Sequence, residues 1–70
     1  MDLQTLMELP EVIEITNKMH QEEVEKLARL LQGFLDTKAE INKLYNMTDD
    51  DEQLKAFAIN TANALAAKEE

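Results

Sequence analysis

The chain contains one proline, Pro10, and one glycine, Gly33, in 70 residues. Both residue types interrupt helices, so a chain with so few of them can form long helices and has little material for β-hairpin turns. Proline fits the first turn of a helix and disfavours helical geometry at the residue before it, here Leu9. We therefore predict a short helix over about residues 2–8 and a new helix that begins at Pro10.

Apolar side chains after Pro10 recur with the period of a helix. A single stripe contains one position in every seven: Ile13, His20, Leu27, Phe34 and Ile41. Further apolar residues lie three or four residues away from members of this stripe: Val24, Leu30, Leu31, Leu44 and Tyr45. This coiled-coil-like pattern predicts one long helix over about residues 10–46. Gly33 could instead end a helix, but the seven-residue spacing continues through it without a shift. We therefore expect a continuous helix that is at most bent at Gly33.

The polar segment from Asn46 to Glu52 predicts a turn, with Thr48 or Asp49 as the N-cap of a last helix over about residues 50–68. The apolar face of that helix comprises Leu54, Phe57, Ala58, Thr61, Ala62 and Leu65. A short turn makes its two flanking helices antiparallel neighbours. The predicted fold is therefore all-α: an antiparallel helical hairpin with a short N-terminal helix, in a single domain over residues 1–70, which assembles into a helical bundle.

The two predicted arms differ in length. A helix over residues 10–46 would be about 55 Å long, and one over residues 50–68 about 28 Å. The shorter arm would then leave the N-terminal part of the longer arm uncovered. We expect a partner or oligomer interface there, formed by Val12, Ile13, Ile15, Met19, His20 and Val24. Small domains without disulfides or metals often gain stability by self-association, so we expect a homo-oligomer, either a dimer or a tetramer.

Composition excludes several classes of function. The absence of cysteine removes disulfides and thiol catalysis, and a single histidine leaves almost no route to a transition-metal site. Fifteen acidic residues against seven basic ones give a formal net charge of −8, which disfavours binding to a nucleic-acid backbone or an anionic membrane. No apolar run is long enough to cross a bilayer, and the N-terminus lacks the pattern of a signal peptide. We expect a cytoplasmic protein without cofactors, without metal and without enzyme activity.

Four features attract a functional interpretation, and each has a simpler structural one. The acidic run Asp49–Glu52 could bind a cation, but capping of the last helix is the better interpretation. His20 could sense pH, but a polar position on the apolar stripe is the better interpretation. Tyr45 could anchor a partner, yet we expect it to be half-buried against the core. Met7 and Met19 fit ordinary core packing better than an adaptable binding surface.

These features predict a small acidic protein-binding module, acting as an adaptor, chaperone or inhibitor through helical surfaces. Its expected partners are a second copy of itself and another protein. Two alternatives remain open from the sequence. One is a self-assembling structural bundle, and the other is an oligomer that holds a small ligand or nucleotide between subunits.

Overall fold

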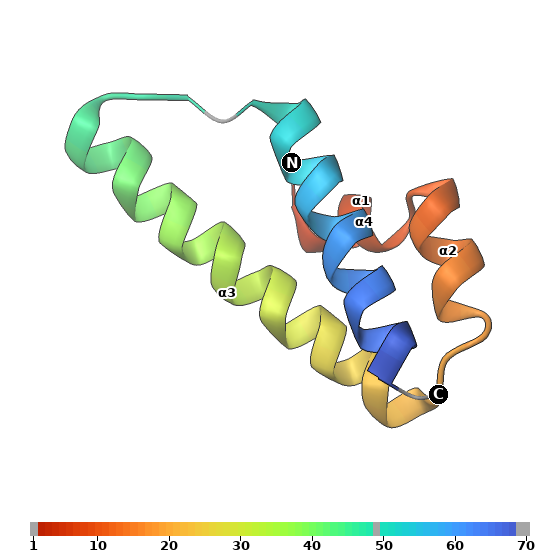
Figure 1. The fold of residues 1–70 in the computed structure, drawn as a ribbon. Helices are drawn as coiled ribbons and strands as arrows, with labels where there is room; N and C mark the ends of the chain where they lie inside the picture. Colours follow the sequence, from red (N-terminus) through yellow and green to blue (C-terminus); the bar gives the residue numbers. More distant parts are fainter. Residues whose placement is uncertain (1, 49, 69–70) are drawn as a thin grey trace.

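The computed structural model describes residues 2–48 and 50–68, of which 83% are helical and none lies in a strand. Four helices follow one another along the chain: α1 (Leu3–Met7), α2 (Pro10–Thr16), α3 (Gln21–Tyr45) and α4 (Asp51–Lys68) (Figure 1). The predicted all-α class, the short N-terminal helix and the antiparallel hairpin, formed by α3 and α4, are confirmed. The helices pack against one another as a small bundle.

The prediction of a single helix over residues 10–46 is wrong, because the chain leaves helical geometry at residues 17–20. α2 ends at Thr16, and the backbone N–H of Met19 donates to the carbonyl oxygen of Thr16 (3.1 Å) in a tight turn. His20 is extended, with φ −69° and ψ 150°, and α3 begins at the next residue. The carbonyl oxygen of His20 then accepts from the N–H groups of Glu23 and Val24, which are in the first turn of α3.

Burial of apolar side chains explains this break. It lets α2 fold back and pack along α4 instead of extending α3 into solvent. Val12 is thereby completely buried, and Ile15 and Met19 pack against the core. Full burial of such a side chain contributes about 1.5–3 kcal/mol, which outweighs the few helical hydrogen bonds lost at the turn. Val12, Ile13, Ile15 and Thr16 are β-branched, so α2 also has little intrinsic preference to continue as a helix.

α1 closes one side of the bundle, where it packs on both α3 and α4. Asp2 caps it: its carboxylate accepts from the backbone N–H of Thr5 (2.9 Å) and from the Thr5 hydroxyl (2.8 Å). Leu6 is completely buried, and Met7 packs against the core, which confirms the packing role expected for this methionine.

The core lies between α4 and the other three helices. Its fully buried members are Leu6, Val12, Leu27, Leu31, Leu54, Ala58 and Ala62, with Leu65 nearly so. Four of these core residues belong to the apolar face predicted for the last helix: Leu54, Ala58, Ala62 and Leu65. Ile59, which does not belong to that predicted face, also packs against the core. α4 contacts α2 on one side and α1 and α3 on the others, and this central position explains why it is apolar on more than one side.

α3 continues through Gly33 without interruption, as the heptad spacing predicted. Its core-facing side begins with Leu27 and ends at Leu35. The next two positions on that side, at three and seven residues beyond Leu35, are Lys38 and Asn42. Because polar groups follow there, the last ten residues of α3 contain no fully buried side chain. α3 is about 37 Å long at the usual rise per residue, and it accounts for most of the 40 Å long dimension of the molecule.

The cap of α4 differs from the sequence prediction by one or two residues. The carboxylate of Asp50 accepts from the N–H of Glu52 (3.0 Å), and its carbonyl oxygen accepts from the N–H of Leu54 (3.1 Å). Asp50 is therefore the N-cap, in place of Thr48, and α4 begins at Asp51. Asp49, the other predicted cap, lies outside the described residues. At the other end of the turn, Asn46 ends α3 in the left-handed conformation (φ 54°), which asparagine tolerates better than most residues.

Candidate functional site

The interface predicted from the sequence lies largely inside the monomer. The structure places its six residues as follows: Val12 is buried; Ile15, Met19 and Val24 are partly buried; Ile13 and His20 are exposed. The premise that this stretch lacks an intramolecular partner is wrong for α2, because α4 packs against α2. Of these six residues, Ile13 is the large apolar one that remains accessible, with 42% of its surface exposed.

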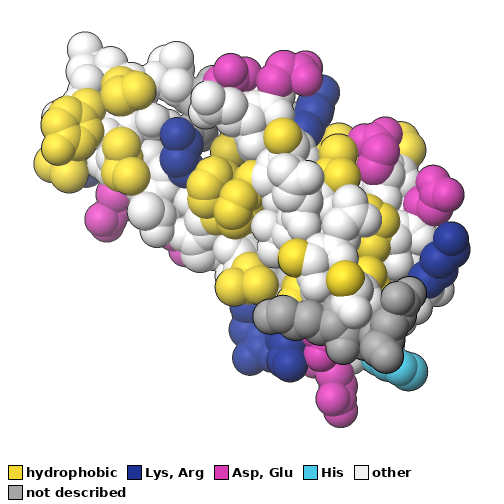
Figure 2. Space-filling model, viewed as in Figure 1, with side chains coloured by type: hydrophobic (Ala, Val, Ile, Leu, Met, Phe, Trp, Pro, Cys, Tyr) yellow, Lys and Arg dark blue, Asp and Glu magenta, His cyan; other side chains and the backbone are white. Residues whose placement is uncertain are grey.

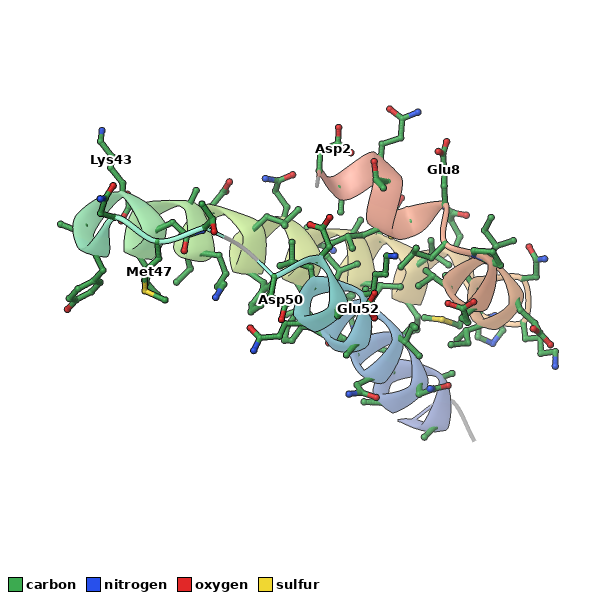
Figure 3. The ribbon with its side chains drawn as sticks, turned by 90° about the horizontal axis from the view of Figure 1, so that it is seen from above. Asp2, Glu8, Lys43, Met47, Asp50 and Glu52 are labelled. Atoms are coloured by element: carbon green, nitrogen blue, oxygen red, sulfur yellow. The ribbon has the colours of Figure 1, made fainter. Side chains whose placement is uncertain are left out.

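Four of the large exposed apolar residues lie at the C-terminal end of α3 and in the turn after it. Leu44 is 78% exposed and Tyr45 71%, and Ile41 and Met47 are exposed beside them. Figure 2 shows these hydrophobic side chains gathered where α3 reaches the turn, away from the rest of the bundle. Lys43 and Met47 point to opposite sides of this end (Figure 3). The expectation that Tyr45 is half-buried against the core is therefore wrong.

Four apolar residues of α3 and one threonine lie on a single line along the helix. Leu30, Phe34, Thr37, Ile41 and Leu44 follow one another at intervals of four, three, four and three residues, which places them on one side of the helix. We call these five residues the α3 stripe. Leu30 is 50% exposed and Ile41 38%, whereas Phe34 is partly covered by α4. This spacing is the one with which a helix packs lengthwise along a second helix.

Phe34 is the point at which the α3 stripe meets the core. Its ring stacks on that of Phe57 in α4, with 3.8 Å between ring centroids and 13° between ring planes. Beyond this pair α4 no longer accompanies α3, because α4 begins well away from the end of α3 (Figure 1). The stripe thus continues from a packed part of α3 to a part beyond Leu35 that, among the described residues, contributes nothing to the core.

One side of the stripe borders an open hollow lined by Ala39, Glu40, Lys43 and Leu44. These residues occupy adjacent turns of α3, so the hollow lies along the helix and is not an enclosed cavity. Its charged groups are on the exposed surface. Such a shape suits the side chains of a packed helix better than a small molecule, which usually occupies a concave pocket that buries most of its surface.

The charge of this end differs from that of the whole chain. Residues 36–48 contain two acidic residues, Asp36 and Glu40, and two basic ones, Lys38 and Lys43. Their formal charges cancel, so the entire net charge of −8 is carried by the rest of the chain. The exposed apolar end is therefore the electrically neutral part of a strongly acidic protein.

The carboxylate of Asp2 serves as a helix cap. Asp2 has a pKa below its usual value because its carboxylate accepts from the backbone N–H and then from the hydroxyl of Thr5, and this is a capping interaction. Within residues 2–48 and 50–68, no three His, Asp or Glu side chains are grouped closely enough to hold a metal ion. The predictions of no enzyme activity, no cofactor and no metal stay predictions.

The residues that the sequence prediction missed had a readable signal. Leu30, Ile41 and Leu44 were assigned to an apolar stripe but were expected to be covered by the last helix. Lys38 and Asn42 show otherwise, because they put polar groups where the core-facing side of α3 would need apolar ones. Where the inner side of a helix becomes polar while an adjacent side stays apolar, that part of the helix extends beyond the core.

No protein-family model, curated protein or solved structure matches this chain. In the part of the chain that the structure describes, no helix is both long and apolar enough to cross a membrane.

Proposed function

We propose that this chain is a small protein-binding module without catalytic activity, and that it binds a helical segment of its partner through the α3 stripe. The observation that carries the proposal is the line of apolar side chains on α3 formed by Leu30, Phe34, Ile41 and Leu44, of which the last two lie where the helix extends past the core. A cytoplasmic location remains part of the proposal, as an expectation from the sequence.

The exposure of these side chains supports the proposal energetically. Leu44, Ile41 and Leu30 are large apolar groups in water, and burying each one completely would contribute about 1.5–3 kcal/mol. Single exposed leucines are ordinary on protein surfaces, but a row of apolar side chains with helical spacing is typical of an interaction surface. An amphipathic helix presents its apolar groups to a partner with this same spacing.

The charge distribution supports a protein partner over a nucleic acid. The stripe and its surroundings have no net positive charge that could attract phosphates, and the rest of the chain is acidic. A neutral apolar surface instead gains most from contact with another apolar surface.

The experiment is site-specific photocrosslinking in the cells that produce the protein. A photoreactive benzoylphenylalanine replaces Leu44, and a control variant carries it at Glu25, which is also exposed on α3 but outside the stripe. We expect protein adducts at position 44 and few at position 25, with the crosslinked peptide mapping to an apolar helical segment. Circular dichroism verifies that both variants remain helical.

A crosslinked protein counts as a partner only if it also binds in purified form and if Ile41→Glu weakens that binding at least tenfold, a loss of about 1.4 kcal/mol. Adducts at position 44 that are no more abundant than those at position 25 would overturn the proposal. So would a purified partner that binds Ile41→Glu and the unmodified chain equally well.

A further inference from the structure

We propose that the partner of the α3 stripe is a second copy of this chain, paired with it antiparallel about Thr37. This inference rests on the proposed function, because it names the occupant of the same surface. Three features carry it: the symmetry of the stripe, the distribution of charge along the chain and the dipole of α3.

The stripe is symmetrical about Thr37. Leu30 and Leu44 each lie seven residues from it, and Phe34 and Ile41 lie three and four residues from it. When a second copy is reversed along the helix axis, Leu30 faces Leu44, Phe34 faces Ile41, and the two Thr37 side chains meet at the symmetry axis. A two-fold interface requires such a self-complementary surface, in which residue i contacts residue j and residue j contacts residue i.

The small residue lies at the centre of this arrangement. A threonine at the symmetry axis lets the two helices approach closely, while the larger side chains on either side fill the space between them. At the two ends of the pairing, the highly exposed Leu44 of one copy would cover the half-exposed Leu30 of the other. The pair would thus bury both copies of Leu44, one at each end of the interface.

The charge distribution favours pairing through this end and in this direction. Residues 36–48 are neutral, so the two copies do not repel each other where they touch. In the antiparallel pair, the two Leu27 positions, each buried in the core of its own bundle, lie about 30 Å apart along the helix axis. This exceeds the screening length of about 8–10 Å in physiological salt, so repulsion between the bundles is small. A parallel pair would place both acidic bundles side by side.

The dipoles of the two α3 helices also favour the antiparallel direction. Each helix has a partial positive charge at its N-terminus and a partial negative charge at its C-terminus. In the antiparallel pair, the C-terminal half of each α3 lies beside the more N-terminal part of the other, so opposite partial charges are closer together than like ones.

The first experiment measures mass in solution as a function of protein concentration, by sedimentation equilibrium from about 1 μM to about 1 mM, a range that spans weak and moderate association. We expect the mass to rise from that of one chain, 8.0 kDa, towards twice that value. Ile41→Glu should weaken the pairing at least tenfold, because it puts a charge in the stripe. Ile13→Glu is the matched control, since Ile13 has similar exposure but lies on α2; it should leave the pairing unchanged.

The second experiment determines the direction of pairing by disulfide formation under a mild chemical oxidant. The chain has no cysteine, so each single substitution introduces the one thiol present. Thr37→Cys should link to itself. Leu30→Cys and Leu44→Cys should each fail to link alone and should link to each other when mixed, because a disulfide requires Cα atoms within about 7 Å.

Three results would overturn the inference. A mass of one chain over the whole concentration range would exclude the pairing, whereas the proposed function would survive if photocrosslinking at position 44 identified a different protein that meets the binding criterion. Self-linking of Leu30→Cys and of Leu44→Cys would show a parallel pair. Dissociation by Ile13→Glu but not by Ile41→Glu would place the interface on α2, where the sequence alone predicted it.

Discussion

The ring of Phe34 in α3 stacks on the ring of Phe57 in α4, with their centroids 3.8 Å apart, and this contact divides α3 into two parts with different surroundings. Before it, Leu27 and Leu31 are completely buried in the core. Beyond it, after Leu35, no residue of α3 belongs to the core, although the whole of this helix is described. The aromatic pair therefore lies at the boundary between the part of α3 that packs in the bundle and the part that is exposed.

Truncation of either aromatic ring tests this contact. Both rings are partly buried, so we expect Phe34→Ala and Phe57→Ala each to lower the free energy of unfolding by about 2–3 kcal/mol, less than the 3–5 kcal/mol typical of a fully buried phenylalanine. The double variant should lose about 0.5–1.5 kcal/mol less than the sum of the two single losses, because the stacking is removed once. Urea titration measures all three. Strict additivity would show that the rings do not interact in solution.

The packing of α2 on α4 gives a second prediction. Val12 is completely buried, whereas its neighbour Ile13 is 42% exposed. We expect Val12→Ala to cost about 2 kcal/mol of unfolding free energy and Ile13→Ala less than about 1 kcal/mol, since the second change leaves no comparable cavity. A continuous helix over residues 10–46, with this stretch in solvent, predicts small and similar losses at both positions. Thermal or denaturant unfolding of the two variants distinguishes the folds.

These two sites also show how much of the fold could be predicted from the sequence. The period of the apolar residues correctly indicated helices and placed Leu27, Leu31, Phe34 and Leu54 on inner faces. It could not reveal the break at residues 17–20, because Ile13 and His20 keep the seven-residue spacing across it. The break depends on contacts between α2 and α4, which lie far apart in the sequence, and local spacing contains no information about them.

The candidate site was predicted less well, for a related reason. Val12, Ile15 and Met19 are apolar and were correctly recognised as needing a partner. The sequence could not decide whether that partner was another copy or α4 of the same chain. α4 packs on α2 and does not extend along the end of α3. The uncovered apolar surface is therefore at the C-terminal end of α3, whereas the sequence predicted it along residues 12–24.

Gly33 provides a stabilising variant. It lies in the middle of α3, its backbone is not in the left-handed region, and a β-carbon added there would meet no atom within 4 Å. We expect Gly33→Ala to raise the free energy of unfolding by about 1 kcal/mol, because alanine restricts the unfolded chain and favours the helix. Denaturant unfolding at a single protein concentration measures the gain. A loss of stability would show that α3 is bent or broken at Gly33 in solution.

Asp2 gives a prediction of pH dependence. Its pKa is lower in the folded chain than in the unfolded chain, because the N–H and the hydroxyl of Thr5 donate to the carboxylate. A lowered pKa contributes stability that is fully present above the unfolded value, near pH 4, and is lost as the pH falls through the folded value. The cap of α1 should therefore weaken only in acid. Titration of the Asp2 carboxyl followed by NMR should give a midpoint below the usual aspartate value, and Thr5→Ala should raise it. A midpoint at or above the usual value would contradict the cap.

The central claim is that the α3 stripe is a binding surface that is occupied by a second copy of the chain. Amide NMR spectra recorded during dilution from about 1 mM to about 10 μM, the range of a weak to moderate association, test it residue by residue. We predict that the signals of residues 30–44 change with concentration, that those of α2 stay constant, and that Ile41→Glu abolishes the changes. Signals of residues 30–44 that are independent of concentration, or changes concentrated in α2, would contradict the account.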